Sequence, residues 1–191
     1  IPGPNAAMIE LKSARKNVTS MLTLFTKSPL PRGANSVLLQ RYGYESSRGN
    51  KIKILHTTLN SLTYNQIKGQ LGFKIDVEED GICLVNPQKE ILGYWDKETL
   101  KKSFERKLPE LLYVKAETKD YGPNEKFWFN EAWLLSGFDF NSFINLLKKR
   151  TILVDIRMGQ YFNGRSHDHG TGFRVFPDQL DLCFHHRKKI M

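Results

Sequence analysis

The tripeptide Glu10-Leu11-Lys12 places a carboxylate and an ammonium group two residues apart, close to the start of a 191-residue chain. On a β-strand, residues i and i+2 share a face, so Glu10 and Lys12 are expected side by side with Leu11 turned into the core. Metal-dependent phosphodiester hydrolysis uses carboxylates to hold Mg²⁺ and a lysine to orient water and stabilise developing charge. The carbonyl oxygen of Leu11 is a further candidate metal ligand.

A second copy of the pattern, Glu117-Thr118-Lys119, competes with the first. Glu-x-Lys is a common tripeptide, and an exposed strand edge or an ordinary salt bridge explains either copy equally simply. The second copy has a polar middle residue and is followed by the turn-like Asp120-Tyr121-Gly122. We therefore rank it below the first copy, although the spacing alone leaves both open.

The elements that must position these residues indicate a mixed α/β (α+β) fold. Alternating apolar residues predict strands over 8–12 and 21–26, joined by a polar turn over 14–19. A meander is expected over 73–77, 82–85 and 90–94, with a hairpin turn at Glu79-Asp80-Gly81. Asp96 is a good N-cap for a helix over 97–106, and residues 139–149 form an amphipathic helix.

The rest of the chain continues this mixed pattern. Residues 37–42 predict a strand or short helix, and strands are expected over 51–57, 111–117, 126–133, 151–157 and 173–176. Phe127 and Phe129 are expected to pack to one side of their strand, and Trp95, Trp128 and Trp133 to be core residues. A Gly- and His-rich loop spans 159–172, and a last helix with a basic end starts at Pro177-Asp178. No interior linker is visible, so residues 1–191 are interpreted as a single domain, a mixed sheet flanked by helices.

The net charge of +9, from 29 basic and 20 acidic residues, suits a polyanionic partner such as nucleic acid. The longest apolar runs are far below the ~18–20 residues of a membrane span, and the start of the sequence has no signal-peptide pattern. Cys83 and Cys183 form neither a metal-type pair nor a disulfide framework, which indicates two reduced thiols inside the cell.

A cluster of base-reading side chains follows residue 150. Guanine offers O6 and N7 to a bidentate arginine, and the N4 amine of cytosine donates to a carboxylate, so such a cluster can read G·C pairs in the major groove. The candidates for DNA binding are Arg157, Arg165, His167, Asp168, His169, Thr171 and Arg174, with Arg15 beside the proposed active site. A zinc site built on His167, Asp168 and His169, with Cys183 and His185 available, is the alternative interpretation of the same residues.

Three blocks of sequence resemble one known family. Glu10-Leu-Lys-Ser-Ala-Arg15 followed by Leu22-Thr-Leu-Phe-Thr26 resembles the active-site hairpin of MvaI/BcnI-type restriction endonucleases, in the MutH-like branch of the PD-(D/E)xK fold. Residues 114–117 and 127–132 resemble later strands of that family. Residues 154–157 with His167-Asp-His-Gly-Thr-Gly-Phe-Arg174 resemble its DNA-recognition segment. The likeness covers most of the chain and favours Glu10-Leu11-Lys12 over the second copy.

The resemblance implies a restriction-endonuclease-like mixed sheet flanked by helices and a type II restriction endonuclease that cleaves double-stranded DNA with Mg²⁺. It implies a short target with C·G pairs, a monomer, a cognate methyltransferase as a functional partner, and a prokaryotic cytoplasm. The helical N-terminal portion of the family is expected to precede Ile1.

Asn5 is the main departure from the family pattern, which has the form Asp-x4-Glu-x-Lys. Asn5 stands at the position of the metal-binding Asp, so metal affinity is expected to fall, through either an engineered inactivating change or a natural silent site. Lys107 falls where MutH-like nucleases carry a second lysine and is a candidate contact of the scissile phosphate. A solvent-facing lysine at a helix end is the alternative for Lys107.

Three functions therefore remain open from the sequence. The first is the type II restriction endonuclease. The second is a MutH-like nicking enzyme of mismatch repair, against which the 167–174 segment argues. The third is a DNA-binding relative without catalysis.

Overall fold

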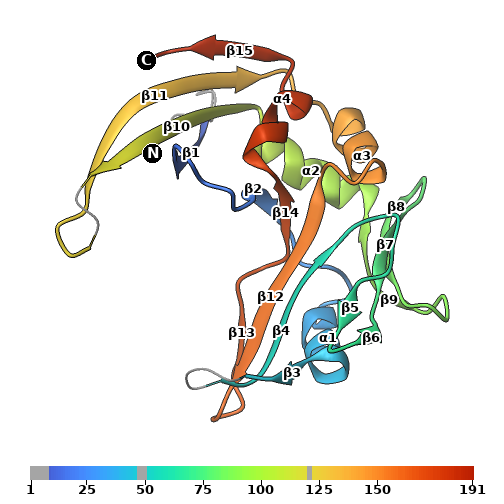
Figure 1. Ribbon diagram of the computed structural model, residues 1–191. Coiled ribbons are helices and arrows are strands. Elements are labelled where there is room, and N and C mark those ends of the chain that lie inside the picture. Colours follow the sequence, from blue (N-terminus) through green and yellow to red (C-terminus); the bar gives the residue numbers. More distant parts are fainter. Residues whose placement is uncertain (1–8, 47–50, 120–121) are drawn as a thin grey trace.

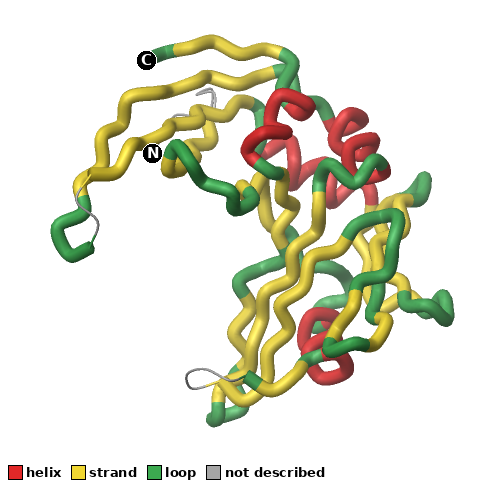
Figure 2. The backbone as a smooth tube through the Cα atoms, in the orientation of Figure 1, coloured by secondary structure: helices red, strands yellow, loops and turns green. Residues whose placement is uncertain are grey.

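The computed structural model describes residues 9–46, 51–119 and 122–191. Two β-sheets form the upper and lower arms of a C-shaped molecule, and most of the helices lie where the arms join (Figures 1 and 2). This arrangement confirms the expected mixed α+β class, with more strand than helix.

The upper sheet has the order β1-β10-β11-β15, formed by Ile9–Arg15, Glu110–Lys119, Lys126–Ser136 and His186–Lys189. β1 pairs parallel to β10, with Glu10 opposite Leu111 and Lys12 opposite Tyr113. Within the described residues, β1 is an edge strand of this sheet. The catalytic candidates therefore stand at a sheet edge, where substrate has access.

The lower sheet has the order β2-β14-β12-β4-β3, and β13 pairs with β12. These strands are β2 (Leu22–Thr26), β3 (Tyr44–Glu45), β4 (Lys51–Leu59), β12 (Leu153–Tyr161), β13 (Ser166–Asp168) and β14 (Gly172–Val175). The smaller sheets are β5 (Gln66–Ile67) with β6 (Gln70–Leu71), and β7 (Lys74–Val77) with β8 (Gly81–Val85) and β9 (Ile91–Asp96). The last three are the predicted meander.

Two of the helices lie where the sequence predicts them, and an aspartate caps each. Helix α2 (Lys97–Lys107) follows Asp96, whose side chain accepts a hydrogen bond from the Thr99 N–H at 2.8 Å. Helix α3 (Phe140–Lys148) follows Asp139, whose side chain accepts one from the Ser142 N–H at 2.9 Å. Helix α1 (Ala34–Tyr42) resolves the strand-or-helix ambiguity of that segment in favour of a helix. These caps fix both helices against the core.

An aromatic cluster in the core joins the lower sheet to the helices and to the meander. Phe173 of β14 stacks on Phe25 of β2 with centroids 4.7 Å apart, and it also contacts Phe143 of α3 and Trp95 of β9. Phe104 of α2 packs against the same group. Phe173 therefore packs β14 against β2 in the lower arm and also contacts helix α3 where the arms join.

Three expectations about the elements are wrong. β1 and β2 are not a hairpin, because β1 pairs with β10 in one sheet and β2 pairs with β14 in the other. The segment 159–172 is not simply a loop, since β12 runs on to Tyr161 and β13 returns along it. The last segment holds only a short 3₁₀ turn (Pro177–Gln179) and α4 (Leu180–Cys183), and its basic end is strand β15.

Candidate active site

Glu10 and Lys12 lie on one face of β1, and the Lys12 Nζ is 2.7 Å from a carboxylate oxygen of Glu10. The Glu10 side chain is 25% exposed and that of Lys12 is 24% exposed, so both are partly buried and still accessible to a ligand. By register they share this face with Leu111 and Tyr113, which are buried. We name it the inner face of the upper sheet. The expected juxtaposition of carboxylate and ammonium is therefore present in the fold.

Leu11 does not enter the core, contrary to the expectation from the sequence. Its side chain is 63% exposed and that of Ile9 is 50% exposed, because the core packs on the inner face, where Ala14 contacts it. The Lys16 N–H donates to the Ala116 carbonyl of β10, so the backbone N–H and C=O groups of even-numbered residues in this edge segment point towards β10. The backbone groups of odd-numbered residues point to the opposite side, and the Leu11 carbonyl therefore points away from β10.

The second Glu-x-Lys copy lies on the same inner face of β10 but is engaged differently. Glu117 accepts a hydrogen bond from Lys16 Nζ at 2.7 Å, which is the chief reason that its pKa is lowered. The same contact raises the pKa of Lys16. Glu117 therefore pairs with a lysine from the segment after β1 rather than with its own Lys119.

A further charged group, Lys115 with Glu131 and Trp133, continues the inner face. Glu131 accepts hydrogen bonds from Lys115 Nζ at 2.9 Å and from the Trp133 indole at 2.7 Å. These bonds lower the pKa of Glu131, with the Lys115 contact the largest cause. The spacing of these residues in the sequence did not reveal the group, because its members lie on two strands and only the register of the sheet brings them together.

The recognition candidates gather around a residue that sequence reasoning did not select, Asp155. Its buried carboxylate accepts hydrogen bonds from Thr58 at 2.9 Å and from Arg157 Nε at 2.7 Å, and lies 3.1 Å from Arg174. Asp155 is 2% exposed. The available signal was an acidic residue two positions before Arg157, and so on the same face, in a strand of mostly apolar residues.

His167, Asp168 and His169 are held on β13 and the turn after it. The Nε2 atoms of His167 and His169 are 2.9 Å apart, and Asp168 accepts hydrogen bonds from Asn35 at 2.7 Å and from the Gly170 N–H at 2.8 Å. Asp168 lies opposite Met158 of β12. The structure therefore brings these residues together with Arg157, whose carbonyl accepts from the His169 N–H.

The remaining candidates divide into exposed and buried ones. Arg165 lies exposed in the turn between β12 and β13, whereas Thr171 is 1% exposed, so its hydroxyl is not presented to a ligand. Arg15 is exposed and pairs with Glu125 at 2.9 Å. Lys107 is the exposed last residue of α2, before β10 begins at Glu110. Asn5 lies outside the described residues.

The zinc interpretation gains no support from the geometry. Within the described part of the chain, no group of three or more His, Cys, Asp or Glu side chains is arranged to hold a metal ion. Cys183 is a buried free thiol of α4 rather than a neighbour that completes the His167–His169 pair.

In the described residues, no helix is long and apolar enough to cross a membrane.

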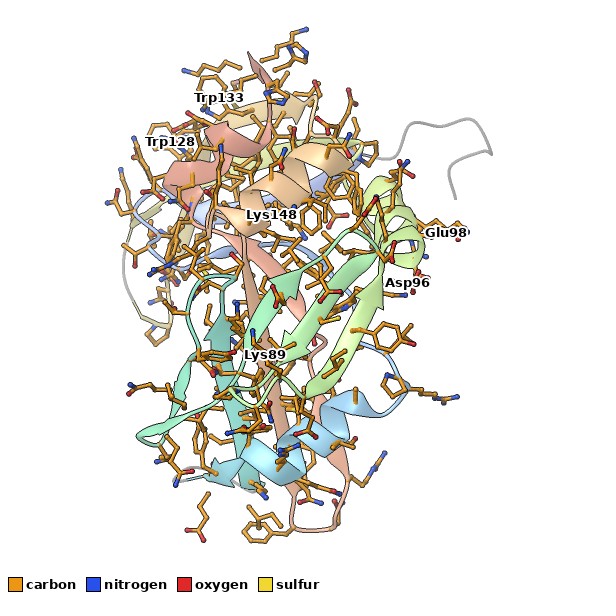
Figure 3. All side chains as sticks on the ribbon, turned by 90° about the vertical axis from the view of Figure 1, so that its right-hand side faces the viewer. Lys89, Asp96, Glu98, Trp128, Trp133 and Lys148 are labelled. Carbon is orange, nitrogen blue, oxygen red and sulfur yellow. The ribbon has the colours of Figure 1, made fainter. Side chains whose placement is uncertain are left out.

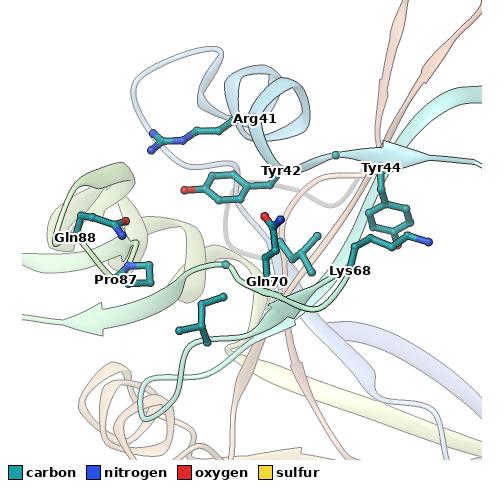
Figure 4. Close-up of a pocket in the computed structure, with 11 residues that line it drawn as sticks. Arg41, Tyr42, Tyr44, Lys68, Gln70, Pro87 and Gln88 are labelled. Atoms are coloured by element: carbon teal, nitrogen blue, oxygen red, sulfur yellow. The ribbon is translucent and has the colours of Figure 1, made fainter.

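Two hollows lie on the described part of the protein, one beside the candidate active site and the other away from it. One of about 700 Å³ is lined by Arg15, Lys16, the residues up to Ser20 and Glu117, next to the candidate active site. Another, of about 520 Å³, lies in the lower arm between the end of α1 and the β5–β6 hairpin (Figure 4). None of the predicted site residues lines the second hollow.

The comparison with family models decides the identity. The model described as "MvaI/BcnI restriction endonuclease family" matches residues 1–184. The chain belongs to this family. Restriction endonuclease is therefore its class of activity, with DNA as the substrate, and the resemblance noted in its sequence blocks is confirmed. No curated protein sequence matches the chain.

Two solved structures of a family member agree with this assignment. The structure described as "Restriction endonuclease MvaI-cognate DNA substrate complex" has 31% sequence identity and a TM-score of 0.80, over 96% of this chain and 78% of that one. The structure "Restriction endonuclease MvaI in the absence of DNA" has 32% identity and a TM-score of 0.66, over 98% and 80% of the two chains. The expected restriction-endonuclease-like fold is confirmed.

Proposed function

We propose that this restriction endonuclease hydrolyses phosphodiester bonds of double-stranded DNA with Mg²⁺, at a short site that contains C·G pairs, and that Asn5, in place of the Asp of the family pattern, lowers this activity in the chain as it stands. The observation that carries the proposal is the Glu10–Lys12 pair at 2.7 Å on an edge strand of a family member's fold. Figure 1 places β1 in the upper arm and β13 in the lower arm, both on the open side of the C. A duplex in that opening meets cleaving and reading residues together.

The chemistry of the available oxygen atoms supports Mg²⁺, which prefers carboxylate and carbonyl ligands. Glu10 and the outward-pointing Leu11 carbonyl are such donors among the described residues. The third donor stands at position 5, which is Asn5 here and an Asp in the family pattern. Mg²⁺ held by these donors would polarise the phosphate and activate a water molecule. Lys12 orients the attacking water and stabilises negative charge on the phosphate, and Lys107 binds the phosphate that is cut.

The reading residues of the lower arm recognise the bases. The terminal nitrogens of Arg157 pair with guanine, because Asp155 occupies its Nε, and Arg174, Arg165, His167, Asp168 and His169 complete the recognition surface. Arg15 binds a backbone phosphate near the cut. The protein acts as a monomer, and a methyltransferase that modifies the same site protects the host DNA.

Plasmid cleavage in Mg²⁺ tests the proposal. We expect Asn5→Asp protein to cut at defined sites, and Glu10→Gln or Lys12→Met in that background to lower the rate by more than about a hundredfold. Glu117→Gln is the matched control, because it removes the carboxylate of the competing motif. The proposed function fails if Asn5→Asp protein cuts no site. The choice of motif is wrong if Glu117→Gln abolishes cutting and Glu10→Gln does not.

The alternative of a DNA-binding relative without catalysis predicts a different result. In that case both the chain as it stands and its Asn5→Asp variant bind the same DNA fragment but leave it uncut. A MutH-like nicking enzyme would instead produce singly nicked plasmid that depends on a partner protein.

A further inference from the structure

The end of the β10–β11 hairpin carries an exposed aromatic side chain between cationic ones. Trp128 is 59% exposed, which overturns the expectation that it belongs to the core. Lys119 Nζ lies 5.9 Å from the Trp128 ring centre, and Lys119 and Lys126 face each other in the register of the two strands. The hairpin end projects beyond the rest of the upper sheet (Figure 1). A large apolar ring on a projecting basic hairpin favours contact with a partner.

An extra residue in β11 decides which way Trp128 points. Lys115 pairs with Glu131, but the next residue, Ala116, pairs with Phe129, so Asn130 is a bulge. Because of this shift, Trp128 stands opposite Glu117 rather than opposite Thr118. A bulge re-aims the side chains beyond it. Trp128 is thereby turned to the inner face, the face of Glu10 and Lys12.

The two neighbouring phenylalanines lie on the other side of the hairpin. Phe127 and Phe129 pair with Thr118 and Ala116, stack on each other with centroids 6.5 Å apart, and Phe127 meets Arg15. They are 47% and 52% exposed. The same hairpin therefore offers a control pair of aromatics on the face turned away from the catalytic residues.

The charge around Trp128 suits a polyanion. Among the described residues, Glu117, which stands opposite Trp128, is paired with Lys16, and Glu125 is paired with Arg15. Lys119, whose Nζ lies over the Trp128 ring, is a cationic group that a phosphate backbone running along the hairpin end can contact.

We propose that Trp128 with Lys119 forms an additional DNA-binding site, which holds the duplex beyond the cleaved bond. Lys119 binds a phosphate, and the indole packs against the sugars and base edges of the groove, as apolar wedges do in other DNA-binding proteins. This inference rests on the proposed function, since it requires a duplex on the inner face. Trp133, by contrast, is half-buried, its indole donates to Glu131, and Arg187 lies over its ring. Figure 3 labels both tryptophans in the upper part of the molecule.

Tryptophan fluorescence with acrylamide as quencher tests the site in the full chain, with linear plasmid DNA in EDTA. Of the three tryptophans, Trp95 is buried and Trp133 half-buried, so Trp128 dominates the accessible signal. We expect saturating DNA to lower the quenching constant about twofold, and to leave it unchanged in Trp128→Phe. Trp128→Ala should weaken binding about tenfold, Trp128→Phe should retain most of it, and Phe129→Ala should change it less than about twofold.

The outcomes separate this site from the function as a whole. If wild type binds the plasmid while Trp128 stays accessible and Trp128→Ala binds equally well, the additional site is overturned and the proposed function stands. Equal losses in Trp128→Ala and Phe129→Ala also overturn it, because they indicate general support of the hairpin. Protection that rises with protein concentration without DNA indicates self-association and overturns it as well. If wild type binds no DNA, the proposed function fails and the additional site with it.

Discussion

The carboxylate of Asp155 holds the guanidinium of Arg157 by its Nε, at 2.7 Å, from two residues away on the same face of β12. Asp155 is buried and its partner is about half-exposed, so the bond joins the core to the recognition surface. An arginine fixed through its Nε presents its two terminal nitrogens as a fork of defined direction. That geometry is the one that bidentate reading of guanine requires.

Replacing Asp155 by Asn should weaken recognition more than folding. The amide cannot accept from Arg157, Arg174 and Thr58 as the carboxylate does, so both arginines lose their orientation. We expect discrimination between cognate and mismatched duplexes to fall by about 1–3 kcal/mol, measured by competition binding. The exposed Asp178→Asn is the control. Unchanged discrimination in Asp155→Asn would remove Asp155 from the recognition argument.

The Lys115–Glu131 pair predicts a pH-dependent contribution to stability. The pKa of Glu131 is lowered in the folded protein from its ordinary value of 4.5, so the unfolded chain binds protons more readily. The stabilisation is complete above pH 4.5 and is lost as the pH falls through the lowered folded value. In urea unfolding, the free-energy difference between wild type and Glu131→Gln should shrink from about pH 6 to about pH 3. A constant difference would contradict the assignment.

Loss of Phe173 from the core should be costly, because this residue is fully buried and contacts Phe25, Phe143 and Trp95. We expect Phe173→Ala to lower the free energy of unfolding by about 3–5 kcal/mol. Urea denaturation followed by circular dichroism measures it. Phe162→Ala, at a residue that is 73% exposed, should change stability by less than about 0.5 kcal/mol.

Cys183 should be inert in the native protein. Burial raises the pKa of its thiol to about 12, so almost none is thiolate at neutral pH. Iodoacetamide at pH 7.5 should therefore modify Cys183 only after denaturation, which peptide mass spectrometry detects. Rapid alkylation of the native protein at this residue would show that α4 opens readily.

Local patterns were enough to predict part of this architecture. Asp96 predicted the start of α2, because a cap acts within one helical turn, and the amphipathic pattern of residues 139–149 predicted α3. The i, i+2 spacing predicted that Glu10 and Lys12 would share a face, because strand alternation is a local property. The resemblance of three sequence blocks also predicted the family correctly.

By itself, then, the sequence determined the family, the capped helices and the pairing of carboxylate and ammonium within one strand. Only the tertiary structure decided that β1 and β2 enter different sheets, that Leu11 faces outward and that Asp155 anchors two arginines. It also decided, through the bulge at Asn130, that Trp128 joins the catalytic face. These features depend on which strands pair and in which register. Register is set by contacts between distant segments, so no local pattern encodes it.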